Sequence, residues 1–362
     1  MSTVFWADIH VGNPKRHGGP LVAGVNDRCR EILSVLHAAS QAAVRANAEA
    51  VYVLGDLFDS PRPSPQVLTA TMQALEPLRR AGIELRLLVG NHDRASDACN
   101  DHALGPMGFV DEIAVVAEPT FYWQGAQAGA VLCVPFLPQQ TADTVLAEAD
   151  KLVAEATAEY ESIAPGCGGP RLLLAAHLGI IGKDTPPFLR DAPGAIRVER
   201  LQRWCADRKV EVALAGDWHG RTVWRGLPGQ AVVAQVGALV PTGWDNPGLD
   251  GYGSIIGWTP GTQPTIDSLP GPRFLRAPSA GAAVKLASAA RANGSSPRII
   301  VEVTQSTAVG RTAARAAADA AKSAGTLDEA LAAYVGEMAL DDENRREEVL
   351  RRAGGYLRGK GE

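Results

Sequence analysis

Val51-Tyr52-Val53-Leu54-Gly55-Asp56 is the stretch of sequence that predicts the fold, because a run of apolar residues stops abruptly at a residue of metal-binding type. Apolar runs of this length are typical of strands that are buried on both faces of a sheet. The same pattern occurs in four other places, where apolar runs end at Asp8, Gly90-Asn91-His92, His177 and Gly216-Asp217-Trp218-His219. Five buried strands that end in polar side chains are therefore expected.

Helical patterns separate the first three of these strands. Apolar residues recur at helical spacing over residues 27–47 and again over 67–81. A strand, a helix and a parallel strand in this order form a βαβ unit with a right-handed crossover. Ligands of such sheets bind at the carboxyl ends of the strands. The polar residues that end the apolar runs are therefore expected to lie in the ligand-binding region.

The rest of the chain extends this α/β pattern. Further helices are expected over residues 143–163 and 199–207, and further strands over 231–236 and 254–258. Two sheets packed as a β-sandwich and flanked by helices would accommodate these elements.

A domain boundary is expected where Pro and Gly become frequent, between residues 259 and 272. The two predicted domains are residues 1–272 and residues 273–362. The second has a strand pattern followed by three helical patterns, at 298–303, 312–324, 327–340 and 341–356. It is therefore expected to be a small α/β appendage.

Composition narrows the class of protein. The chain has 362 residues, 46% of them hydrophobic, which is enough for one large domain and a smaller one. With a formal net charge of −5, any contact with nucleic acid would depend on local basic patches. The 5 cysteines are scattered without a C-x-x-C pair, which favours a reducing cytoplasm over a disulfide framework. Neither a signal peptide nor the ~18 apolar residues of a membrane span is evident, so we expect a soluble, unexported protein.

Five motifs carry the chemical prediction: D-x-H at 8–10, G-D at 55–56, G-N-H-D at 90–93, His177 and G-D-x-H at 216–219. Each is weak evidence alone, since an isolated His177 would more often be a core histidine. Their order, each at the end of a predicted strand, makes coincidence a poor explanation. Two divalent ions ~3.5–4 Å apart can activate water and neutralise phosphoryl oxygens in phosphodiester hydrolysis. A shared carboxylate must hold such ions together, and Asp56 is the candidate.

The motifs resemble those of the calcineurin-like metallophosphoesterases over residues 1–250. The stretch Gly55-Asp56-Leu57-Phe58-Asp59-Ser60-Pro61-Arg62-Pro63-Ser64-Pro65 is similar to the second motif of SbcD-type and eukaryotic double-strand-break repair nucleases, which continues into Leu-Phe and Arg-Pro-Ser. Protein serine/threonine phosphatases have G-N-H-E where this chain has Asp93. The resemblance implies the four-layer metallophosphoesterase fold and a DNA exonuclease of repair or recombination, with single-strand endonuclease activity as a further expectation.

The resemblance also implies a role for each motif residue. One metal ion would be bound by Asp8, His10 and His219, and the second by Asn91, His177 and Asp217. Asp56 would bridge the two ions. His92 would stabilise the transition state or protonate the leaving oxygen.

Position 217 departs from the family pattern, in which the last motif is usually G-H-x-H. Asp217 replaces the first of these histidines, and we expect a substituted ligand rather than loss of the second metal site. A carboxylate makes that site harder. Two divalent ions are therefore expected, with Mn²⁺ as the first choice and Mg²⁺, Fe²⁺ or Zn²⁺ as alternatives.

Basic residues beside the motifs are candidates for contacts with substrate phosphates. Lys15, Arg16 and His17 follow the first motif, although a solvated loop explains them equally well. Arg62 and Arg94 follow the second and third motifs, and Arg62 could instead hold its Pro-rich turn.

Partners and rival functions complete the expectations. SbcD-type proteins use segments beyond the nuclease domain to bind an ABC-type ATPase, and an apolar stripe within 327–338 would suit such a contact. DNA, an SbcC-type ATPase and a second copy of the chain are the candidate partners, and no membrane contact is expected. The rivals are a phosphatase or small-molecule phosphodiesterase, which the net negative charge favours, and a non-catalytic scaffold, which the intact His92 argues against.

Overall fold

The computed structural model of the protein describes residues 2–14, 18–98, 100–124, 129–185, 189–192, 194–226, 230–242, 254–269, 273–278, 280–292 and 297–301. The chain divides into two compact units, one of Met1–Arg276 with Ala283–Ile300 and one of Ala277–Ala282 with Val301–Glu362. Most of the second unit lies outside the described residues, including the expected helices at 312–324, 327–340 and 341–356. The sheets and the candidate site belong to the first unit.

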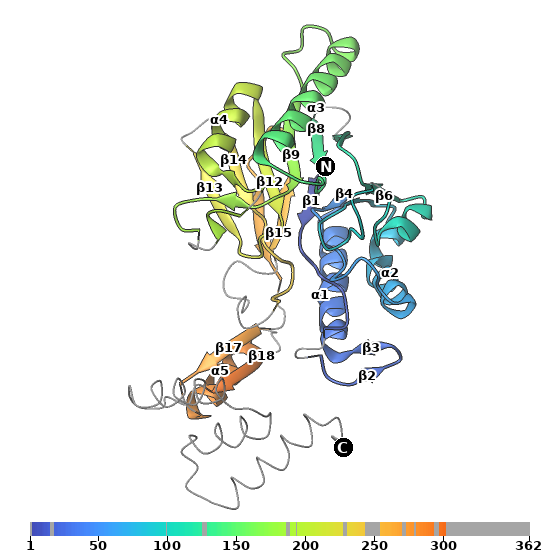
Figure 1. Ribbon diagram of the computed structural model, residues 1–362, viewed down its shortest axis with the longest axis vertical. Helices are drawn as coiled ribbons and strands as arrows, with labels where there is room; N and C mark the ends of the chain where they lie inside the picture. Colours follow the sequence, from blue (N-terminus) through green and yellow to red (C-terminus); the bar gives the residue numbers. More distant parts are fainter. Residues whose placement is uncertain are drawn as a thin grey trace, which may run out of the picture. The chain divides into compact units, whose positions relative to one another are not determined.

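The first of two six-stranded sheets contains the N-terminal strand (Figure 1). Its order is β16 (Thr265–Ser268), β15 (Ser254–Trp258), β1 (Ser2–Trp6), β4 (Ala48–Val53), β5 (Glu84–Leu88) and β6 (Ile113–Val116). Strands β1, β4, β5 and β6 are parallel, whereas β15 pairs antiparallel with β1. Helix α1 (Asp27–Arg45) connects β1 to β4 through the small strands β2 and β3, and α2 (Pro65–Arg80) connects β4 to β5. The expected βαβ units are therefore present.

The second sheet has the order β13 (Thr222–Arg225), β14 (Val232–Gln235), β12 (Val210–Gly216), β9 (Arg171–His177), β8 (Gly129–Val134) and β7 (Thr120–Gln124). Its four central strands are parallel and both edge strands are antiparallel to their neighbours. Helix α3 (Ala142–Ile163) connects β8 to β9, and α4 (Val198–Arg208) precedes β12.

The two sheets pack face to face, and helices cover their outer faces (Figure 1). Within β4, Val51 and Val53 pack against α1 and α2, whereas Tyr52 packs in the layer between the sheets. Such strands are buried on both faces, which explains why their sequences are continuously apolar. The expected two-sheet β-sandwich flanked by helices is confirmed.

Local capping fixes where the helices start. The Asn26 side chain accepts a hydrogen bond from Cys29 N at 2.8 Å at the start of α1, and Thr141 forms a capping box with Thr144 at the start of α3. The four helices predicted within residues 1–272 begin and end within two residues of α1, α2, α3 and α4.

Smaller elements complete the described chain. They are β2 (Leu21–Val22), β3 (Val25–Asn26), the 3₁₀ helix η1 (Gly105–Phe109), β10 (Ile180–Ile181), β11 (Ile196–Arg197), β17 (Arg273–Ala277), α5 (Ala280–Ala292) and β18 (Pro297–Val301). Strands β17 and β18 form a two-stranded sheet. Within the described ranges, the structure contains no helix with the length and apolar character needed to cross a membrane.

Candidate metal centre

The five motifs follow or end the parallel strands β1, β4, β5, β9 and β12. Main-chain hydrogen bonds extend the β1–β4 pairing into the first two motifs. Ile9 N and His10 N donate to Asp56 O at 2.9 and 3.0 Å, and Val11 N donates to Leu57 O at 2.8 Å. The backbone therefore holds these two motifs in register beyond the ends of their strands.

Four of the predicted ligands have a left-handed backbone conformation. The φ angle is 51° at Asp8, 52° at His10, 53° at Asp56 and 88° at Asp217. Residues with a side chain rarely adopt this region, and those that do so cluster at functional sites. The main-chain hydrogen bonds between the first two motifs help to hold this conformation at His10 and Asp56.

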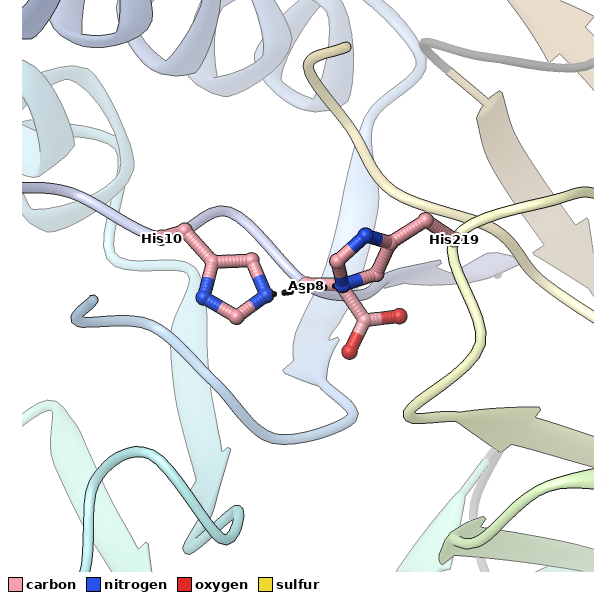
Figure 2. Close-up of side chains that lie close together, drawn as sticks. All are labelled: Asp8, His10 and His219. Atoms are coloured by element: carbon pink, nitrogen blue, oxygen red, sulfur yellow. Dashed lines mark hydrogen bonds between the residues drawn. The ribbon is translucent and has the colours of Figure 1, made fainter. Parts of the chain in front are cut away.

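Asp8, His10 and His219 form the first cluster. The Nε2 atoms of His10 and His219 lie 3.0 Å apart although 209 positions separate them in the chain. Figure 2 shows the two rings facing each other through these nitrogens, beside the Asp8 carboxylate. Asp8 is fully buried; its Oδ1 accepts from Asp217 N at 2.9 Å, whereas its Oδ2 has no hydrogen-bond partner.

His177, Asn91 and Asp217 form the second cluster. His177 Nε2 lies 2.9 Å from Asn91 Oδ1 and 4.0 Å from Asp217 Oδ1. His177 Nδ1 donates to Leu54 O at 2.7 Å, so in the neutral ring the Nε2 lone pair faces these oxygens. A Cβ at Gly55 would lie 2.0 Å from His177 Nδ1, and φ there is +89°, so the turn requires glycine. Asp217 thus lies where a substituted second-site ligand is expected.

Asp56 lies between the two clusters. Its Oδ2 is 3.7 Å from His10 Nε2 and 3.6 Å from His177 Nε2. Its Oδ1 accepts from His92 N at 2.9 Å, which fixes the orientation of the carboxylate. A single buried oxygen therefore faces one imidazole from each cluster, as a bridging ligand requires.

Electrostatics differ between the clusters. Burial raises the pKa of Asp8, lowers that of His10, and lowers that of His219 to about 4. Burial alone would also lower the pKa of His177, but the carboxylates around it, Asp56 first, outweigh burial and raise that pKa to about 9. Burial thus dominates the pKa values in the first cluster, whereas the neighbouring carboxylates together outweigh burial at His177.

These donors fit divalent cations. A buried carboxylate oxygen without a partner is costly, and a cation in contact with Asp8 Oδ2 would remove that cost. The same ion could accept the lone pairs of the facing His10 and His219 nitrogens. Carboxylate, imidazole and amide oxygen donors on both sides of Asp56 match the ligand types of a two-metal site.

His92 contacts the clusters through its backbone, and its side chain is exposed. His92 Nδ1 donates to Asp59 O at 3.2 Å, so the neutral ring keeps its lone pair on Nε2. Its ring meets that of His10 edge-on, with centroids 4.7 Å apart. This arrangement suits a residue that contacts a substrate beside the metals.

Asp93 supports the backbone of the candidate site. In the sequence it served only to distinguish this chain from protein serine/threonine phosphatases. Its carboxylate is fully buried and accepts main-chain hydrogen bonds from Leu57 N at 3.3 Å, Phe58 N at 2.9 Å and Gly90 N at 3.0 Å. These bonds tie the second motif to the third. Its place at the end of the G-N-H-D motif is the feature of the sequence that could have indicated this role.

Thr242 and Asp59 are further neighbours of the ligands that the sequence did not single out. Thr242 Oγ1 lies 3.3 Å from His219 Nδ1, and Asp59 Oδ1 lies 3.9 Å from His10 Nδ1. Asp59 follows Asp56 by three positions, which is a weak signal, whereas no sequence pattern marks Thr242.

The basic residues predicted to contact substrate have different surroundings. Arg94 Nη1 donates to Phe136 O at 2.9 Å, and the Phe136 ring packs edge-on against His177. Arg94 therefore supports the wall of the second cluster. Arg62 has an exposed side chain, and its main-chain N donates to Ser60 Oγ within the Pro-rich turn. Lys15, Arg16 and His17 lie outside the described residues.

The family model of the calcineurin-like phosphoesterases matches residues 1–221, more than half of the chain, so the protein belongs to this family. It is accordingly a metal-dependent hydrolase of phosphoester bonds. The matched residues contain every predicted ligand together with His92, and the expected superfamily is confirmed.

A curated relative is the DNA double-strand break repair protein Mre11 of Archaeoglobus fulgidus. It is 27% identical over 114 residues, which cover 31% of this chain and 24% of that protein. The alignment thus spans about a quarter of the relative's length.

Similar solved structures include two phosphatases. A dimetal phosphatase from Danio rerio is 10% identical, with 66% of this chain and 87% of that chain covered at a TM-score of 0.42. A purple acid phosphatase from yellow lupin (Lupinus luteus) seeds is 13% identical, with 71% and 48% covered at a TM-score of 0.46.

Proposed function

We propose that the protein is a two-metal DNA exonuclease similar to the SbcD-type repair nucleases. The observation that carries this proposal is the second motif, in which Asp56 continues into Leu57-Phe58-Asp59 and then into Arg62-Pro63-Ser64. The partial similarity to archaeal Mre11 supports the same substrate class. A role in DNA repair or recombination, with endonuclease activity on single strands, is part of this proposal.

The two clusters would hold the two ions, with Asp56 as the ligand that both share. When bound, these ions would activate water and neutralise charge on the phosphoryl oxygens. Asp8, His10 and His219 would hold one ion, and Asn91, His177 and Asp217 the other. The buried, hydrogen-bonded Asp56 would fix the spacing between them.

His92 would act on the substrate directly. Because its Nδ1 donates to Asp59 O, a protonated ring presents Nε2–H to a phosphoryl or leaving oxygen. Its exposed side chain, next to the Asp56 carboxylate, suits that contact. Proton transfer by a positioned side chain typically contributes ~10²–10⁴-fold to the rate.

Mn²⁺ is the metal that we propose for both sites. Asp217 gives the second cluster a carboxylate where the family pattern has an imidazole, and oxygen ligands favour harder ions over Zn²⁺. Its Oδ1, 4.0 Å from His177 Nε2, supports a role as a ligand.

Substrate phosphates would contact basic residues at the rim of the site. Arg62 is exposed and follows the bridging Asp56 by six positions. Lys15, Arg16, His17 and Arg94 remain candidates for such contacts, Arg94 alongside its bond to Phe136 O.

Digestion of end-labelled linear duplex DNA in the presence of Mn²⁺ tests the proposal. Bis(p-nitrophenyl) phosphate and p-nitrophenyl phosphate, assayed in parallel, separate diester from monoester hydrolysis. We expect release of labelled nucleotides and cleavage of the diester. Activity on the monoester alone would overturn the nuclease assignment and favour the phosphatase that the net charge of −5 allows.

We also propose an SbcC-type ABC ATPase as a partner, on the same motif evidence. The apolar stripe expected to bind it, within 327–338, lies outside the described residues. Co-purification with such an ATPase, and its loss on Leu331→Asp, is the test.

A further inference from the structure

One nitrogen of the His10 imidazole has no hydrogen-bond partner. Its Nε2 faces His219 Nε2 at 3.0 Å and Asp56 Oδ2 at 3.7 Å. Its Nδ1 is buried and unpaired, in a residue that is only 7% exposed. A buried N–H without a partner is unfavourable, so something in this part of the fold should satisfy His10 Nδ1.

The Asp59 carboxylate faces this nitrogen, with Oδ1 at 3.9 Å from His10 Nδ1. That distance is too long for a hydrogen bond but suits a bridging water. A cavity of about 50 Å³ is lined by both residues, together with Arg28 and Thr242. A cavity of this volume has room for a bridging water molecule, which needs roughly 10–15 Å³.

The backbone holds Asp59 against the first motif. Asp59 N donates to Val11 O at 3.1 Å, and Val11 and Phe58 form a parallel bridge. A Cβ at Gly12 would lie 2.8 Å from Asp59 Cβ, so the glycine permits this close approach. The position of the carboxylate beside His10 is therefore set by main-chain contacts.

A different atom of Asp59 contacts the second imidazole. Its main-chain oxygen accepts from His92 Nδ1 at 3.2 Å, and the His92 ring lies edge-on to His10. The side chain and the main chain of one residue thus face the two histidines separately.

We infer that Asp59 is a positioning residue whose carboxylate orients His10 through one water, separately from the main-chain contact that its carbonyl makes with His92. This inference rests on the proposed two-metal site. A histidine that binds a metal commonly donates its other N–H to a carboxylate or water, which fixes the tautomer and the orientation of the ring. With its proton on Nδ1, His10 directs the Nε2 lone pair toward Asp8 and His219.

Substitution of the side chain separates these roles, because the main-chain carbonyl remains. Mn²⁺ titration by calorimetry of the full chain should resolve two binding events. We expect Asp59→Ala to weaken one of them by ~10–100-fold, with Asp59→Asn intermediate because its amide oxygen can still accept. Asp97→Asn, an exposed aspartate after the third motif, is the matched control and should leave both events unchanged.

A double-mutant cycle distinguishes action through His10 from action through His92. At saturating Mn²⁺, His92→Ala should lower kcat by the same factor in the Asp59→Ala background as in the natural sequence. If His92→Ala lowered kcat by a smaller factor in the Asp59→Ala background than in the natural sequence, or if Asp59→Ala left Mn²⁺ affinity unchanged, the inference would be wrong.

Failure of the proposed function gives a different result. If the natural chain bound no Mn²⁺, the two-metal site itself would be wrong and this inference with it. If the natural chain and Asp59→Ala both bound two ions with equal affinity, only the role of Asp59 would be lost.

Discussion

The two clusters on either side of Asp56 are built from different donors. The first presents two imidazoles and one carboxylate, from Asp8, His10 and His219. The second, around His177, presents one imidazole, one carboxylate and one amide oxygen. Nitrogen donors suit softer ions and oxygen donors suit harder ones. The candidate site thus combines an imidazole-rich half with an oxygen-rich half, and the Asp56 carboxylate faces both.

The different donors around the two clusters also give their histidines different pKa values. Burial lowers the pKa of His219 to about 4, so the first cluster presents unprotonated nitrogen at neutral pH. At His177, burial is outweighed by neighbouring carboxylates, Asp56 first and Asp217 second, and the pKa rises to about 9. The Asp at position 217 therefore changes both the hardness and the charge of the second cluster.

Loss of the shared ligand should have the largest effect. Asp56→Asn removes the charge that both clusters use, so we expect both ions to be lost. Activity on bis(p-nitrophenyl) phosphate should fall by about 1,000-fold or more, which corresponds to about 4 kcal/mol of transition-state stabilisation. Metal analysis of the purified variant checks the cause. Two retained ions with full activity would contradict the bridging role.

His92→Ala should leave both clusters intact while removing catalysis. The main-chain hydrogen bond from residue 92 to Asp56 does not need the side chain. We expect kcat to fall by ~10²–10⁴-fold with two ions still bound. Full activity would show that His92 is not catalytic.

Asp217 provides a direct test of the contrast between the clusters. Asp217→Ala should bind one ion per chain, and Asp217→His should bind two with a preference shifted toward Zn²⁺. Metal content after growth in mixed-metal medium measures both outcomes. An unchanged metal content in Asp217→Ala would exclude Asp217 as a ligand.

Thr242 should affect the first cluster alone. Its hydroxyl lies 3.3 Å from His219 Nδ1, so Thr242→Val should weaken one Mn²⁺ binding event by about tenfold. Thr242→Ser keeps the hydroxyl and should restore the affinity. Equal weakening of both events by Thr242→Val would mean that the substitution disturbs the whole site.

The smallest effect is expected from Arg62, the exposed residue proposed to contact substrate phosphates at the edge of the site. Arg62→Ala should weaken DNA binding and reduce the slope of log affinity against log salt by about 1, as loss of one phosphate contact does. Arg203→Ala, at an exposed position of α4, is the control. Identical salt slopes for the two variants would remove Arg62 from the substrate-binding residues.

The parts of the fold that the sequence predicted best are the elements with a clear pattern of their own, such as a continuous apolar run. The strands before Asp8, Asp56 and His177 are buried on both faces, so their apolar runs were conspicuous. Strand β7 was not predicted, because it lies at a sheet edge with half-buried aromatic residues and has no alternating pattern. Edge strands of this kind depend on their neighbours more than on their own sequence.

The residues of the candidate site also divide into those with a local sequence signal and those without one. The predicted ligands follow strands and could be predicted as a set, because parallel strands bring their carboxyl ends together. Thr242 lies beside His219, 23 positions away in the chain, and Asp59 lies beside His10, 49 positions away. Such contacts depend on how loops that are distant in the chain lie next to each other in the fold. No periodic pattern in the sequence predicts that arrangement.

Anomalous diffraction from crystals grown with Mn²⁺ would test the two-metal site most directly. We predict two peaks ~3.5–4 Å apart, with Asp56 in contact with both, Asp8, His10 and His219 around one, and Asn91, His177 and Asp217 around the other. A single peak, or two peaks without a shared Asp56 contact, would contradict the account.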